Sequence, residues 1–181
     1  GSLAERGEWD RALHHYLEAA RIWPQDYALW NELAARFIER QEYPAAAAAA
    51  ERAVAAAPRT VTPHQLLAVS LLRMRKPSAA AQAARHGLEQ AGPDATLYYL
   101  LATALERLGD MPGAAEAMSE SARLDAAWQA WFRAADLYAR AGLVARAYGA
   151  LDSAWRHAAP DSAALELLTR YRRELASRDI P

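Results

Sequence analysis

The side chains that could perform acid–base or metal chemistry in this chain are few and lie far apart. His14 and His15 are adjacent, so on a helix they point about 100° apart and cannot share a ligand as an i, i+4 pair could. His64, His86 and His157 fall in three separate segments, with no carboxylate at metal-ligand spacing. We therefore expect these histidines to be ordinary surface or packing residues, and we expect no metal site.

Motifs of catalytic and nucleotide-binding sites are also absent. The sequence contains no G-x-x-x-x-G-K-[ST], H-E-x-x-H, G-x-S-x-G or G-x-G-x-x-G. Asp110 and Asp136 are isolated carboxylates, which we interpret as a turn residue and a helix-face residue. There is no cysteine, so disulfides, zinc ribbons and thiol chemistry are excluded. The sequence thus predicts a protein that is not an enzyme, with no catalytic residue and no cofactor.

Composition argues against two classes of partner. The 181 residues are 53% hydrophobic and 24% charged, with a formal net charge of -1. This charge provides no overall attraction to nucleic acid or to anionic membranes, and no apolar stretch reaches membrane-spanning length. We expect no nucleic-acid partner and no direct membrane insertion. Lys76 is the only lysine against twenty arginines, which suggests a GC-rich bacterial genome and leaves both periplasm and cytoplasm open.

Internal repetition is the strongest signal in the sequence. Ala12, Ala46, Ala80, Ala114 and Ala147 recur at spacings of 34, 34, 34 and 33 residues, and each opens the same pattern of small and large side chains. Periods of about 20 to 50 residues are typical of solenoids, in which each unit buries its apolar face only against its neighbours. Such an array predicts a binding surface rather than a reaction.

The unit at 27–60 shows the pattern most clearly. Its pattern residues are Trp30, Leu33, Ala34, Phe37, Ala46, Ala50, Ala53 and Pro58. The first four stand at i, i+3, i+4 and i+7, which predicts one apolar helix stripe. A short turn and a second helix follow, and in three units the second helix begins with a proline, a residue that the first turn of a helix tolerates. These prolines are Pro44, Pro77 and Pro112.

This order, present in four successive units, resembles the tetratricopeptide repeat (TPR) family. The resemblance implies an all-α fold, a right-handed α-solenoid (TPR superhelix) of antiparallel helix hairpins with a C-terminal capping helix. The expected divisions are an expression scar at 1–2, a partial repeat at 3–26, repeats at 27–60, 61–94, 95–127 and 128–161, a capping helix at 162–177 and a tail at 178–181.

Two features of this plan are specific enough to check. The repeat at 95–127 is one residue short, because Leu124-Asp125-Ala126-Ala127 replaces the longer turn Ala57-Pro58-Arg59-Thr60. We therefore predict that the hairpins on either side of Asp125 meet at a different angle from the others. In the capping helix, the residues expected to cover the last hairpin are Leu165, Leu168, Tyr171 and Leu175, while Arg170, Arg172 and Arg173 lie on a solvated face.

The resemblance also indicates which residues face a ligand. In TPR arrays the first helix of each hairpin lines the concave side, and certain repeat places commonly touch the bound segment. At those places we select as partner-binding residues Asn31, Gln65, Tyr99, Thr103, Arg107, Phe132, Arg133, Asp136 and Arg140. We predict that Tyr99 and Phe132 anchor a peptide or helix of another protein, and that the arginines bind its acidic or carbonyl groups. The alternative is that both aromatic residues only pack between hairpins.

Two functions are open at this point. The first is a protein–protein interaction scaffold within a larger bacterial protein, such as a cell-envelope or exopolysaccharide-export scaffold. The second is a regulatory or substrate-presenting domain of an enzyme whose catalytic part lies outside this chain. Binding of acidic chaperone tails is not expected, since only Asn31 fits the two-carboxylate clamp of that TPR class. We also expect self-association through a truncated N-terminal hairpin that leaves Trp9, Leu13 and Tyr16 uncovered.

Overall fold

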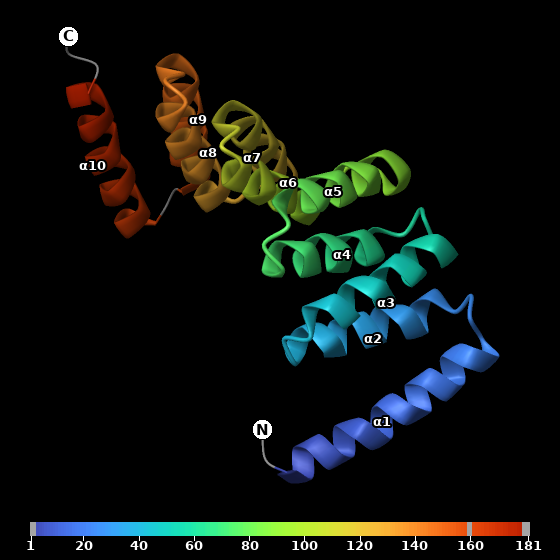
Figure 1. The fold of residues 1–181 in the computed structure, drawn as a ribbon. Helices are drawn as coiled ribbons and strands as arrows, with labels where there is room; N and C mark the ends of the chain where they lie inside the picture. The colour runs from blue at the N-terminus through green and yellow to red at the C-terminus, as the bar shows by residue number, and fades with distance from the viewer. Residues whose placement is uncertain (1–2, 159–160, 179–181) are drawn as a thin grey trace.

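The computed structural model describes residues 3–158 and 161–178. Within these residues the backbone forms ten helices and no strand. Their bounds are α1 Leu3–Ile22, α2 Tyr27–Glu39, α3 Tyr43–Ala56, α4 Val61–Arg73, α5 Pro77–Ala91, α6 Ala95–Leu108, α7 Met111–Asp125, α8 Trp128–Arg140, α9 Val144–Ala158 and α10 Ser162–Arg178. Figure 1 shows them stacked in chain order into an elongated, curved array, with α1 and α10 at the two ends. The predicted all-α array of hairpins is confirmed.

The turn inside each of the four hairpins has one geometry. A single residue adopts the left-handed conformation, with φ of 62° at Gln41, 57° at Arg75, 84° at Gly109 and 73° at Gly142. The following N–H donates back to the end of the first helix, as from Lys76 N to Leu71 O at 2.9 Å. This is the helix ending that glycine favours, because a Cβ in the left-handed region costs about 1 kcal/mol or more. Gln41 and Arg75 therefore hold a strained backbone where the other two hairpins use glycine.

Aspartates begin several helices. Asp26 accepts from Ala28 N at 3.0 Å, and Asp94 accepts from Leu97 N at 2.7 Å. Asp110, which we interpreted as a turn residue, accepts from Gly113 N at 3.0 Å at the start of α7. These carboxylates satisfy backbone N–H groups that have no partner within the helix.

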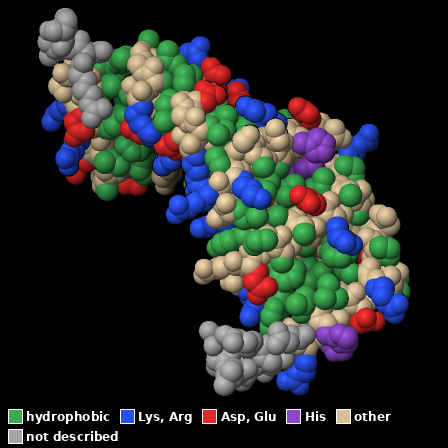
Figure 2. Space-filling model, in the orientation of Figure 1, with side chains coloured by type: hydrophobic (Ala, Val, Ile, Leu, Met, Phe, Trp, Pro, Cys, Tyr) green, Lys and Arg blue, Asp and Glu red, His purple; other side chains and the backbone are tan. Residues whose placement is uncertain are grey.

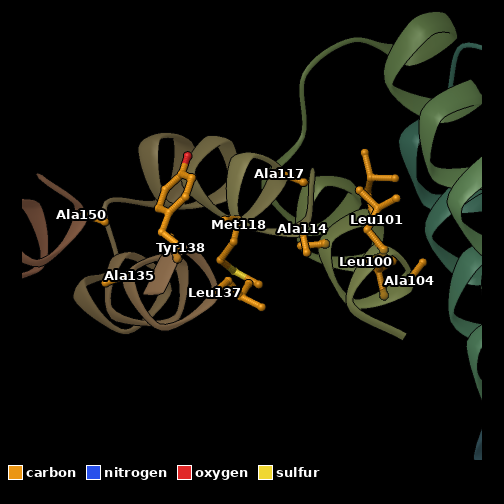
Figure 3. Packing of buried hydrophobic residues seen from close by; sticks show 14 of the residues in the cluster. Leu100, Leu101, Ala104, Ala114, Ala117, Met118, Ala135, Leu137, Tyr138 and Ala150 are labelled. Carbon is orange, nitrogen blue, oxygen red and sulfur yellow. The ribbon is translucent and has the colours of Figure 1, made fainter. Parts of the chain in front are cut away.

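Small residues let the two helices of each hairpin pack closely. Four pairs at corresponding places are buried: Ala34 with Ala46, Ala68 with Ala80, Ala102 with Ala114, and Ala135 with Ala147. Larger side chains such as Leu101, Met118 and Tyr138 fill the core of α6 to α9 (Figure 3). The alanine run after Tyr43 is a packed helix, as predicted, since Ala46, Ala49 and Ala50 are buried.

A partly buried hydrogen bond recurs one repeat apart. Trp30 Nε1 donates to Pro24 O at 2.9 Å, and His64 Nε2 lies 2.8 Å from Pro58 O. His64 is fully buried, and a Cβ on Gly87 would lie only 2.7 Å from its Cβ. His64 is therefore a packing residue that replaces the tryptophan of the preceding repeat, as expected from its isolation in the sequence.

The N-terminal edge differs from the prediction. Helix α1 runs through Gly7, where the repeat pattern places a turn. Trp9, Leu13 and Tyr16 are partly buried rather than uncovered, because α1 turns this stripe toward the core of α2 and α3. Among the side chains that the structure describes at this edge, the exposed apolar ones include Leu17, Ile22 and Trp23. At the other end α10 matches its prediction, with Leu168 and Leu175 buried and Leu165 and Tyr171 packed against the core.

Candidate partner-binding surface

The first helices of the hairpins form the inner side of the array. Besides its neighbours in the chain, α4 contacts both α2 and α6. No comparable approach joins the second helices within the described residues, so the array is narrower on the side of the first helices. All of the predicted partner-binding residues lie on these helices: Asn31 on α2, Gln65 on α4, Tyr99, Thr103 and Arg107 on α6, and Phe132, Arg133, Asp136 and Arg140 on α8.

The close approach of the first helices is interrupted between α6 and α8. Only Ala126 and Ala127 connect α7 to α8, and Ala126 adopts a left-handed φ of 51°. A pocket of about 380 Å³ lies here, between the start of α6, the end of α7 and the start of α8. Its lining includes Tyr99, Met118 and Arg133. The shortened connection therefore coincides with an opening at the inner face, while the predicted change of angle remains a prediction.

Loss of a hydrogen bond accompanies the short connection. Trp131 occupies the place of Trp30 and His64, but its buried Nε1 has no hydrogen-bond partner among the described residues. For Trp30 and His64 the partner is the carbonyl six residues before the ring, in the turn that precedes the helix. The missing residue lies in the segment that would supply this carbonyl, which explains the unpaired N–H.

One carboxylate binds two of the arginines that were predicted to contact a partner. Glu106 of α6 accepts from Arg133 Nη2 and from Arg140 Nη1, each at 2.6 Å. Arg140 Nη1 also lies 3.6 Å from Asp136 Oδ2. Burial acts to raise the pKa of Glu106, but the hydrogen bonds and charges of Arg140 and Arg133 outweigh it and hold the pKa below its ordinary 4.5. These arginines are therefore engaged with Glu106.

The two predicted aromatic anchors have different surroundings. Phe132 packs edge-on against Tyr171 of α10, with ring centroids 5.0 Å apart, and Tyr171 Oη donates to Asp136 Oδ1 at 3.1 Å. Phe132 thus helps to seat the capping helix on α8. Tyr99 is 48% exposed and lies in the pocket between α6 and α8. The structure does not bring these two rings into one pocket.

The remaining predicted residues make contacts within the array. Gln65 Nε2 donates to Asp94 Oδ1 at 2.9 Å, and Arg107 Nη1 donates to Leu72 O at 2.7 Å, so both join the second hairpin to α6. Thr103 Oγ1 donates to Tyr99 O in its own helix. Asn31 Oδ1 is buried and has no hydrogen-bond partner among the described residues.

Glu106 is a member of this surface that was not expected from the sequence. The sequence contained a signal for this pairing. Glu106 itself stands at a repeat place that commonly faces the ligand, and its charge is opposite to that of Arg133 and Arg140. Repeat places, taken one at a time along the array, do not reveal pairs across neighbouring hairpins. Two arginines that were expected to be free for a partner are therefore paired in the structure.

Metal and membrane sites do not emerge from the geometry. Over the described ranges, no group of three or more histidine or acidic side chains is placed to hold a metal ion. No helix in this part of the chain combines the length and hydropathy needed to cross a bilayer.

Comparison with known protein families identifies the repeat. The tetratricopeptide repeat profile matches residues 2–59 and 66–127, more than half of the chain. None of the curated proteins compared with the chain matches it.

Solved structures support the same fold. MamA superposes with a TM-score of 0.73 at 17% identity, covering 86% of this chain and 85% of that one. YrrB, described as a TPR protein with an unusual peptide-binding site, gives 0.69 at 19% identity and covers 94% and 87%. TTC0263, a thermophilic TPR protein of Thermus thermophilus, gives 0.60 at 20% identity and covers 96% and 94%. With its repeated hairpins and the matching family profile, the chain belongs to the tetratricopeptide repeat family.

Proposed function

We propose that this chain is a protein–protein interaction scaffold that binds a peptide or a helix of a partner along its inner face, with Tyr99 as the central anchor. TPR domains generally mediate protein–protein interaction and are typically not catalytic.

The observation that carries the proposal is the exposed Tyr99 beside the pocket between α6 and α8. A tyrosine supplies a large, rigid apolar area together with a hydroxyl, which is why this residue type is enriched at binding hot spots. The Tyr99 side chain is 48% exposed next to a partly apolar opening. Covering it with a partner removes apolar surface from water, which favours binding. The pocket, about 380 Å³ in volume, can receive an apolar side chain of the partner.

The other predicted residues take separate roles in this proposal. Thr103 and Arg107 follow Tyr99 along the same helix at intervals of four residues, so the three form a stripe on α6. Arg133 lies at the edge of the pocket and can bind a carbonyl of the partner through donors that Glu106 leaves open. Phe132 acts indirectly, since its contact with Tyr171 positions α8 and α10.

The test compares two exposed aromatic residues on opposite helices of the hairpins. Tyr99→Ala removes the proposed anchor from α6, and Trp155→Ala removes a partly exposed aromatic side chain from α9, a second helix. Partners are captured from extracts of the source organism with the wild-type chain, and their affinities are measured for each variant. Truncation of a hot-spot aromatic typically costs on the order of 2 kcal/mol, or roughly thirtyfold in Kd. We expect this loss for Tyr99→Ala and a change of less than about threefold for Trp155→Ala.

Thermal unfolding of both variants separates binding from folding. Tyr99→Ala should leave the helical content and the melting temperature nearly unchanged, because half of the side chain is exposed. If Tyr99→Ala keeps the same partners at the same affinity, or if its loss of binding only follows a loss of stability, the inner face at α6 is not the binding surface.

A further inference from the structure

A second pocket lies at the other end of α6, beside the turn between α4 and α5. Its volume is about 510 Å³, and it is lined by Leu72, Arg73, Arg75, Pro77 and Arg107. This described lining contains three arginines and no carboxylate, and Lys76 follows Arg75 directly in the same turn. Figure 2 shows Lys and Arg side chains gathered near the middle of the molecule, over the region where Figure 1 places this turn. We call this feature the basic pocket.

The cations of the basic pocket lack acidic partners. None of the ion pairs among the described residues involves Arg73, Arg75 or Lys76. Arg107 donates to the uncharged carbonyl of Leu72, which fixes the guanidinium at the pocket without neutralising it. The contrast with Arg133 and Arg140, which share Glu106, is direct. A concentrated positive charge therefore remains open at this one turn.

The turn geometry positions Arg75 in the basic pocket. It occupies the same turn place as Gly109 and Gly142 and shares their left-handed backbone, with φ of 57°. Glycine removes this strain at the other two turns, whereas Arg75 keeps it and presents its side chain to the basic pocket. Gln41 has the same conformation in the preceding hairpin, so the backbone belongs to the repeat turn, and at Arg75 this turn places a guanidinium group at the basic pocket.

We propose that the basic pocket binds an acidic segment of the partner protein, with Asp or Glu carboxylates received by Arg73, Arg75 and Arg107. This inference rests on the proposed function, because it names the chemistry of the segment that also contacts Tyr99. Guanidinium groups match carboxylates in planar, paired hydrogen bonds. The chain carries a net charge of only -1, so it provides no overall electrostatic attraction for a polyanion beyond this turn.

The geometry of α6 relates the two pockets. Tyr99 and Arg107 are eight residues apart on one helix, which corresponds to about 12 Å along its axis. An extended chain spans this distance in about four residues. The partner segment is therefore expected to carry an apolar side chain for the pocket at Tyr99 and carboxylates about four residues away.

The decisive variant is Arg75→Gly, because it should change stability and binding in opposite directions. Removing the strained side chain should raise the melting temperature by about 2 to 4 °C. Removing one of the three guanidinium groups should weaken binding of an acidic peptide by about threefold to tenfold. Gln41→Gly is the matched control, since Gln41 has the same backbone geometry but lies in the preceding hairpin and does not line the basic pocket. This control should gain the same stability and leave binding unchanged.

The probe is a fluorescent synthetic peptide with one leucine and a cluster of glutamates about four residues away, compared with the same peptide carrying glutamines. We expect the glutamate peptide to bind more tightly, and the difference to shrink at high salt. Equal binding of the two peptides, or unchanged affinity in Arg75→Gly, would overturn the inference. A single-stranded oligonucleotide and phosphatidylserine vesicles serve as competitors, and stronger binding of either one also overturns it. The proposed function is tested separately, by the affinity of the Tyr99→Ala variant for the partners captured from extracts.

Discussion

Besides the packing of α7 on α8, the third and fourth hairpins are joined by the pairing of Glu106 with Arg133 and Arg140. The side chain of Glu106 is only 19% exposed, while those of Arg133 and Arg140 are 50% and 42% exposed. The substitution Glu106→Gln keeps the size of the side chain but removes its charge. We predict that this change loosens the junction where α6 and α8 no longer approach closely.

The magnitude follows from the exposure of the three side chains. Ion pairs at exposed positions contribute about 0.2 to 1 kcal/mol each, and hydrogen bonds to buried charged groups contribute more. Glutamine can still accept one hydrogen bond, so part of the interaction survives. We therefore expect Glu106→Gln to destabilise the junction by about 1 kcal/mol, which corresponds to about fivefold faster hydrogen exchange in α8 and α9.

The pH dependence has a defined sign. The pKa of Glu106 lies below its ordinary 4.5 in the folded chain, so its pairing stabilises the fold at pH values above 4.5. As the pH falls below that value and through the folded pKa, the carboxyl takes up a proton and this stabilisation is lost. The difference between wild type and Glu106→Gln should be complete at neutral pH and should decrease as the pH is lowered below 4.5 and through the folded pKa.

The matched control is Glu116→Gln. Glu116 also pairs with an arginine of the next hairpin, Arg146, at 2.8 Å, but its side chain is 61% exposed. This control should change stability by only a few tenths of a kcal/mol. Urea unfolding and hydrogen exchange measure both variants. If the two substitutions have equal effects, or if the effect of Glu106→Gln does not depend on pH, the paired carboxylate is not what holds this junction.

Three further predictions follow from local geometry. Gly142→Ala should destabilise the fourth hairpin by about 1 kcal/mol in urea unfolding, because φ is 73° there; nothing lies within 4 Å of the added Cβ, so an unchanged stability would refute the strain argument. Gly87→Ala should be more damaging, since its Cβ would lie 2.7 Å from that of His64, and a melting temperature equal to that of wild type would show that the site relaxes freely. Phe132→Ala should release α10, seen as faster exchange at Leu168 and Leu175, whereas faster exchange throughout the array would point to a general core role.

The fold was predictable because the same local signals recur in each repeat. Helix stripes, small pairs such as Ala34 with Ala46, and prolines at the second helices are local signals, and their recurrence in phase fixes the arrangement of the hairpins. Even the turn without glycine at Arg75 has the geometry of the others, because its neighbours in the repeat determine it.

The binding surface was less predictable because it depends on pairs across hairpins. Repeat places indicate which face of a helix a side chain occupies. They do not indicate that Glu106 accepts hydrogen bonds from both Arg133 and Arg140. They also do not show that Phe132 packs on Tyr171, since the capping helix lies outside the repeat pattern. The uncovered N-terminal surface was misplaced for a similar reason, because the stripe of Trp9 packs on the following hairpin.

Site-specific photocrosslinking in the source organism shows whether a partner occupies the inner face of the array. A photoreactive phenylalanine analogue replaces Tyr99 on α6 in one variant and Trp155 on α9 in another, so both probes are aromatic and partly exposed. We expect a discrete crosslinked protein from position 99 and none from position 155. A crosslink only from position 155, or the same products from both positions, would show that the partner does not bind specifically at the inner face.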